Sequence, residues 1–276
     1  MSDLVVVLVS VLHMCTYLQE RALCQECLLM LLLDAPHRYN INAVAFTGFT
    51  PLVVAIINGN AAIVRECLRC GADVDQPAPA LQCTPLVAAI LCQHEEIVEE
   101  LLRCGPNPFR ALPNGVAPIH AAVVAGNIRI LTALVRNNNK LTSVRVRAAA
   151  ATTPLHLAAY LGSLPVAKCL LELIPRGDVG KHINSTDNLG RDALFIAVQN
   201  FHADIVVELL KRRADPNRCC AHGHHFATTP LGVAVYVVAT TASSIVLLRC
   251  MYVCRTFTQR FGVVLFHFVH IPKTIF

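Results

Sequence analysis

Charged residues are scarce in this 276-residue sequence: Asp, Glu, Lys and Arg make up 15% of it, against 55% for hydrophobic residues. Tryptophan is absent. The net charge of +5 is too small to indicate a nucleic-acid partner. The sequence also lacks a glycine-rich phosphate loop, a pair of acidic residues at catalytic spacing and a serine–histidine–aspartate set. We therefore expect no enzymatic activity and no cofactor.

A secretory signal is missing as well. The apolar run from residue 4 to 12 is preceded by no basic residue, and the first is Arg21. The run is too short to span a bilayer. Several of the 13 cysteines occupy positions that related segments fill with leucine, as Cys67 does relative to Leu101 and Leu209. Cysteine in such a place acts as a small hydrophobe, which indicates a reducing compartment and a cytoplasmic protein.

The best-defined pattern in the chain is the segment from residue 153 to 173, TPLHLAAYLGSLPVAKCLLEL. Thr153 is a good N-cap and Pro154 suits the first position of a helix. Gly162 and Ser163 interrupt the apolar periodicity, and Pro165 opens a second helical run. The spacing predicts two short helices joined by a turn, and such a pair needs a neighbour to bury its apolar face.

Similar segments recur along the chain. Counterparts of Thr153 stand at positions 50, 84, 117, 192 and 229, so the steps between starts are 34, 33, 36, 39 and 37 residues. A period near 33 with a T-P-L-H-x-A motif resembles the ankyrin repeat family, and residues 153–159 agree with that motif at every position. Residues 70–75 and 214–217 resemble the family's inter-repeat segment. The resemblance implies an all-α ankyrin-repeat solenoid of about six to seven helix-turn-helix repeats, degenerate at both ends.

The repeats divide the chain into three parts. Residues 1–47 are expected to form an apolar N-terminal cap and a degenerate first repeat, and residues 48–248 the main array. Residues 249–276 are an apolar tail that matches no repeat. Residues 231–248 carry no charge, so they fit either a final repeat or a membrane-spanning segment. Two inter-repeat loops, after residue 137 and from 175 to 188, are longer than the rest, and such insertions often lie on a binding face.

Some residues could carry chemistry but have simpler explanations. The cluster from Cys219 to His225 has zinc-ligand residue types without the usual ligand spacing, and a loop explains it as well as a metal site does. The C-x-x-C pairs at 24–27 and 67–70 fall inside expected helices, which favours core positions. By the resemblance, His120 and His156 hydrogen-bond backbone near the hairpin. No metal site is therefore predicted.

The resemblance also suggests where a partner would bind. In the ankyrin family the concave face is built from hairpin tips and the last residues of each first helix. Carried onto this chain, those positions predict a partner-binding set that includes an apolar strip. Its members are Phe46, Phe49, Ile57, Leu81, Leu91, Val124, Tyr160, Gln199 and Tyr236. The alternative is that the next repeat partly covers these side chains.

We therefore expect a monomeric, non-catalytic scaffold or adaptor that binds another protein through this groove. Two alternatives remain. One is a substrate-recognition adaptor of a cullin-type ubiquitin ligase, because residues 254–255 and 271–275 faintly resemble elements of a suppressor-of-cytokine-signalling box. The other is an ankyrin protein attached to a membrane through the uncharged segment after Leu231.

Overall fold

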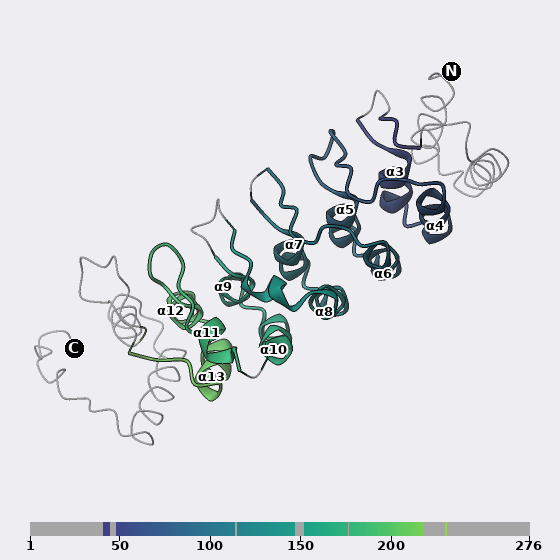
Figure 1. Ribbon diagram of the computed structural model, residues 1–276. Coiled ribbons are helices and arrows are strands. Elements are labelled where there is room, and N and C mark those ends of the chain that lie inside the picture. The colour runs from purple at the N-terminus through teal and green to yellow at the C-terminus, as the bar shows by residue number, and fades with distance from the viewer. Residues whose placement is uncertain are drawn as a thin grey trace, which may run out of the picture. The chain divides into compact units, whose positions relative to one another are not determined.

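A computed structural model describes residues 41–44, 48–113, 115–146, 152–175, 177–217 and 230. Within these ranges the chain is a succession of helix pairs (Figure 1). The first member of each pair is here called the A helix and the second the B helix. The A helices are α3 (Pro51–Ile57), α5 (Pro85–Leu91), α7 (Pro118–Ala125), α9 (Pro154–Leu161) and α12 (Ala193–Gln199). The B helices are α4 (Ala61–Arg69), α6 (Glu95–Arg103), α8 (Ile128–Asn137), α10 (Leu164–Leu173) and α13 (Ala203–Lys211).

The expected start of the A helices at the motif threonine and proline is confirmed. The hydroxyls of Thr50 and Thr84 accept hydrogen bonds from the backbone N–H groups of Val53 and Val87, both at 3.4 Å. In the looser copy, the carboxylate of Asp192 does the same for Phe195 at 2.7 Å. These caps satisfy backbone donors that no helical carbonyl can reach. Helix α7 has no side-chain cap because Ala117 stands where the motif has threonine.

The B helices bury the paired apolar positions that the sequence predicts. Helix α6 is representative: Ile97, Val98, Leu101 and Leu102 are buried on one side, and its glutamates lie on the other. The equivalent residues of α4, α8 and α13 are buried in the same way: Ile63, Val64 and Cys67; Ile130, Leu131, Leu134 and Val135; and Ile205, Val206, Leu209 and Leu210. This face supplies the hydrophobic stabilisation that a single pair could not gain alone.

Side chains of the inter-repeat segments join one repeat to the next. The Asn42 side-chain oxygen accepts from the backbone N–H of Asp73 at 2.7 Å. The Asp75 carboxylate accepts from the N–H of Asn107 at 3.0 Å, one repeat further on. This hydrogen bond, here called the inter-repeat clasp, recurs with the Asn184 side chain and the N–H of Asp215 at 3.2 Å. The assignment of an inter-repeat segment around Asn42 therefore has a structural basis.

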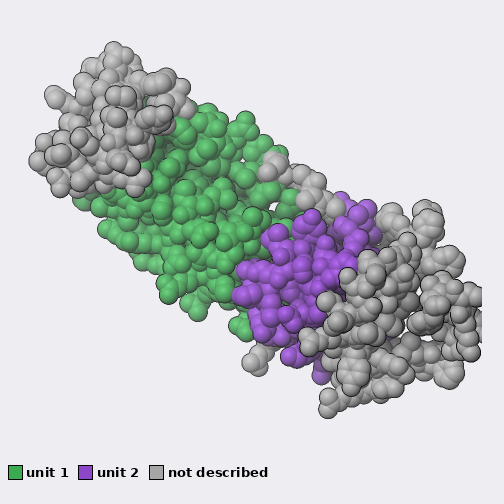
Figure 2. Space-filling model, turned by 180° about the vertical axis from the view of Figure 1, so that it is seen from behind, with its two compact units in different colours: residues 1–157, 169–174 green, residues 158–168, 175–276 purple. Residues whose placement is uncertain are grey.

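The chain divides into two compact units (Figure 2). Unit 1 comprises residues 1–157 with 169–174, and unit 2 comprises residues 158–168 with 175–276. In unit 1 each A helix contacts the next one, α3 with α5 and α5 with α7, and the B helices α4, α6 and α8 do likewise (Figure 1). In unit 2, helix α12 packs on its partner α13.

Both long inter-repeat loops contain structure that periodicity does not reveal. The first forms a short 3-10 helix, η1 (Asn139–Ser143), and then an isolated bridge between Val146 and Thr152. The second contains helix α11 (Val179–Ile183), which buries Ile183. The part of the chain that the structure describes has no helix long and apolar enough to cross a membrane. Residues 1–40, the uncharged segment from 231 to 248 and the tail from 249 to 276 lie outside the described residues.

Candidate functional site

The strongest candidate site lies at the C-terminal ends of the A helices in unit 1. Ile57 and Leu91 are the last residues of α3 and α5, and Val124 is the last but one of α7. Their exposed fractions are 40%, 54% and 59%. Each A helix buries almost all of its preceding residues, so these side chains are exceptions within apolar helices. We call Ile57, Leu91 and Val124 the A-helix strip.

The strip carries no charge of its own. Helices α3, α5 and α7 contain no Asp, Glu, Lys or Arg, and their one titratable histidine, His120, is fully buried. The A helices are also in mutual contact, so equivalent positions on successive helices are neighbours (Figure 1). An uncharged row of exposed apolar side chains is suited to binding another apolar surface. It offers no group for proton transfer or covalent chemistry.

Apolar residues of the inter-repeat segments are exposed in the same unit. Leu81 follows the bridge residue Ala78 in a hairpin and is 46% exposed, whereas Phe49 is half-buried. Sequence reasoning missed Phe109, at 42%, and Val44, at 40%. Both lie in segments that it read only as connections. For Phe109, the available signal was its position in a proline-containing segment just after the helix pair α5 and α6.

Two predicted site residues lie in unit 2. Tyr160, near the end of α9, is 61% exposed, and its backbone carbonyl accepts a hydrogen bond from Nε2 of His202 at 3.1 Å. Gln199, the last residue of α12, is exposed, and its side-chain oxygen accepts from Arg191 at 3.5 Å. Phe46 and Tyr236 fall outside the described residues, so their part in a binding surface stays a prediction.

The two motif histidines differ in their surroundings. The backbone N–H of Thr153 donates to Nδ1 of His156 at 3.1 Å, and the Thr153 hydroxyl lies 2.6 Å from the same nitrogen. This confirms the expected local hydrogen bonding for His156. His120 has Ala117 in place of that threonine, and both of its ring nitrogens are buried without a hydrogen bond of ordinary geometry in the described part of the chain.

Burial lowers the pKa of His120 from 6.5 to about 4, because the charged ring would lose its hydration. The backbone groups of Thr152 and Val144 approach the ring and oppose this effect in part. A neutral histidine in this position is a core residue near neutral pH.

The cysteines of unit 1 are placed as core and surface residues. Burial raises the pKa of the Cys67 thiol to about 12, so this cysteine of the C-x-x-C pair stays protonated. Cys92, the residue after Leu91, is exposed, and partial burial still raises its pKa. Among the residues with described positions, no three His, Cys, Asp or Glu side chains are grouped to hold a metal ion. The cluster from 219 to 225 lies outside that set.

Comparison with known proteins supports the repeat assignment. The sequence model of the family described as ankyrin repeats (3 copies) matches residues 12–111, 100–179 and 119–220. These overlapping matches include every described helix pair and extend into the N-terminal region where the sequence predicts a degenerate repeat. No curated protein matches the sequence.

Proposed function

Because the chain belongs to the ankyrin repeat family, whose members generally mediate protein–protein interaction, we propose that it is a scaffold binding another protein through the A-helix strip. Members of this family are typically non-catalytic. The proposed partner presents an apolar or amphipathic segment, in a helix or an extended peptide. Ile57, Leu91 and Val124 contact its apolar side, with Phe46, Phe49 and Leu81 at the adjoining inter-repeat segments.

The observation that carries this proposal is the exposure of three apolar side chains at equivalent positions of three contacting helices. Elsewhere the A helices are buried, so the exposure is confined to the ends. Burying one leucine-sized side chain contributes about 1.5–3 kcal/mol. Even one such contact changes a dissociation constant by roughly tenfold or more. Tyr160, Gln199 and Tyr236 hold the corresponding sequence positions of later repeats, and the surface proposed in unit 1 does not depend on them.

The test begins with proximity labelling by the full chain in cells, which supplies candidate partners. A purified candidate is then titrated with the wild type and with Leu91→Asp and Val124→Asp. We expect each substitution to weaken binding by about tenfold, because a carboxylate would have to lose water on contact with an apolar partner. Circular dichroism should be unchanged, since both positions are exposed.

Ala62→Asp is the matched control. Ala62 is also exposed, but it is the second residue of the B helix α4, where an acidic side chain suits the helix dipole. A partner that tolerates Leu91→Asp and Val124→Asp, or that is lost equally with Ala62→Asp, would contradict binding at the strip.

A further inference from the structure

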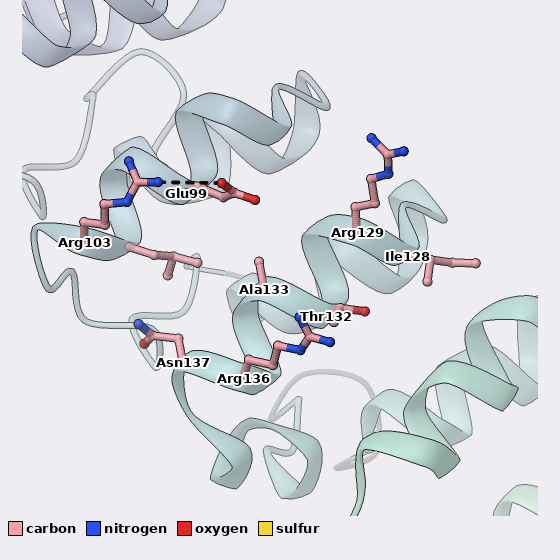
Figure 3. A pocket seen from close by; sticks show the side chains of 9 residues that line it. Glu99, Arg103, Ile128, Arg129, Thr132, Ala133, Arg136 and Asn137 are labelled. Atoms are coloured by element: carbon pink, nitrogen blue, oxygen red, sulfur yellow. Dashed lines mark ion pairs between the residues drawn. The ribbon is translucent and has the colours of Figure 1, made fainter.

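The B helices of unit 1 carry a second surface with different chemistry. Helices α6 and α8 enclose a shallow hollow of about 610 Å³ (Figure 3). Its lining includes Leu102, Ala133 and the exposed Ile128. Arg103, Arg129 and Arg136 surround it, with Glu99 as the one acidic residue of the lining. The lining is therefore positively charged and partly apolar, unlike the uncharged A-helix strip.

The repeat register explains how this hollow arises. The motif starts at 50, 84 and 117 make Arg69, Arg103 and Arg136 equivalent, each in the last turn of a B helix. Three residues before the first two stand Glu66 and Glu100, which pair with those arginines at 3.0 and 2.9 Å. The equivalent of these glutamates in α8 is Ala133. The short side chain leaves space, and Arg136 lacks the carboxylate that its counterparts have.

The other two arginines are already engaged by the chain's own carboxylates. Arg129 pairs with Glu95 of α6 at 3.1 Å, and Arg103 also lies 3.9 Å from Glu99, the pair drawn in Figure 3. Arg136 makes no ion pair with any described residue, and Figure 3 shows its side chain beside Thr132 on the same helix. The positive charge of Arg136 is thus uncompensated, because Ala133 stands where the repeat pattern would place a carboxylate.

We propose that this hollow binds an acidic segment of a partner protein, with a partner carboxylate taking the place of the missing glutamate beside Arg136. An apolar side chain of the same segment packs on Leu102 and Ala133, next to Ile128. Arginine suits this role because its guanidinium binds a carboxylate with two parallel hydrogen bonds. The surface is separate from the A-helix strip and does not depend on it.

The probe is a fluorescein-labelled synthetic peptide of glutamate with leucine at regular intervals, titrated with the full chain at low salt and followed by fluorescence anisotropy. The same peptide with glutamine for glutamate is the control ligand. We expect saturable binding of the acidic peptide that weakens as salt is raised, because exposed charge pairs are screened. The glutamine peptide should bind at least about fivefold more weakly.

Ala133→Glu is the decisive variant, because it restores the pattern of the preceding two repeats: it fills the hollow and gives Arg136 an intramolecular partner. It should weaken binding of the acidic peptide by about fivefold or more while leaving the fold unchanged. Arg136→Gln should act in the same direction. Glu99→Gln should tighten binding, since it removes the one carboxylate of the lining. Leu91→Asp should have no effect.

Three results would overturn the proposal: equal binding of the glutamine peptide, full binding by Ala133→Glu, or no saturable binding by the wild type. The acidic peptide is titrated in the absence of any partner of the A-helix strip. A failure of this proposal is therefore distinguishable from a failure of the proposed scaffold function.

Discussion

His120 shows how one missing hydroxyl alters the chemistry of a repeat. At His156 the motif threonine provides a partner for the ring, whereas at His120 the corresponding residue is Ala117. The ring is still fully buried, so the neutral form is strongly favoured in the folded state. The unfolded chain takes up a proton near pH 6.5, but the folded chain does so only near pH 4.

This difference predicts that the protein loses stability as the pH falls from 6.5 towards 4, because the unfolded state binds more protons in that window. Between pH 7 and pH 5 the loss attributable to His120 should be about 2 kcal/mol. Urea denaturation at the two pH values measures it. The variant His120→Gln should be less stable than the wild type at pH 7. Its stability should nevertheless change far less than that of the wild type between pH 7 and pH 5. An unchanged pH dependence in His120→Gln would show that another group is responsible.

The sequence could predict this buried histidine as a core residue but not its lack of partners. That property depends on the backbone at Val144 and Thr152, which lies near the ring without forming a hydrogen bond of ordinary geometry. The periodic pattern says where a residue stands in the repeat. It does not say how an irregular loop packs against that residue.

At the scale of elements, glycines with a positive φ stand at the ends of helices, and two of them differ in their surroundings. Gly162, between α9 and α10, has a φ of +73°, and a Cβ built there would overlap the ring of His202. Gly71, after α4, has a φ of +84° but open space around it. The two glycines thus separate the cost of a left-handed conformation from the cost of a steric overlap.

Gly71→Ala should destabilise the protein by about 1–2 kcal/mol through backbone strain alone. Gly162→Ala should cost more, about 3 kcal/mol, because the His202 ring must also move. Thermal unfolding of both variants tests the order, and His202→Ala as a background should reduce the excess cost at Gly162. Equal costs at the two glycines would mean that the ring moves aside freely.

The starts of the A helices could be predicted because each is marked by a threonine or aspartate cap or by a proline. The B helices α6 and α13 begin after His94 and His202 without a side-chain cap, so their starts were less clearly marked. Helices η1 and α11 could not, since five residues hold too few apolar positions to show a period. The hollow beside Arg136 was also missed. Arginines and glutamates on a B helix look like an ordinary solvated face until two neighbouring helices are compared position by position.

At the scale of the whole molecule, each repeat of unit 1 is stabilised by packing on the adjoining repeats. Each A or B helix contacts its counterpart in the adjoining repeat. In such a stack the effect of a cavity should be greatest in its own repeat and the next, and smaller beyond. Leu134 of α8 is fully buried and belongs to one end of the contacting series α4, α6 and α8.

Leu134→Ala should therefore cost about 2–5 kcal/mol and lower the amide-exchange protection of α7 and α8 most. Helices α5 and α6 should follow, and α3 and α4 should be affected least. Hydrogen-exchange mass spectrometry resolves this gradient, with exposed Lys140→Ala as the control. A uniform loss of protection across unit 1 would instead indicate that its repeats unfold as one cooperative block.

The inter-repeat clasp has a consequence for the charge of the molecule. Its requirement is a side-chain oxygen that accepts a backbone N–H, and either asparagine or aspartate meets it, as Asn42, Asp75 and Asn184 show. Exchange between these two residue types changes the net charge by one unit while keeping the acceptor in place. The joint between repeats thus fixes geometry without fixing electrostatic character, which leaves the surface potential of the stack open to adjustment one repeat at a time.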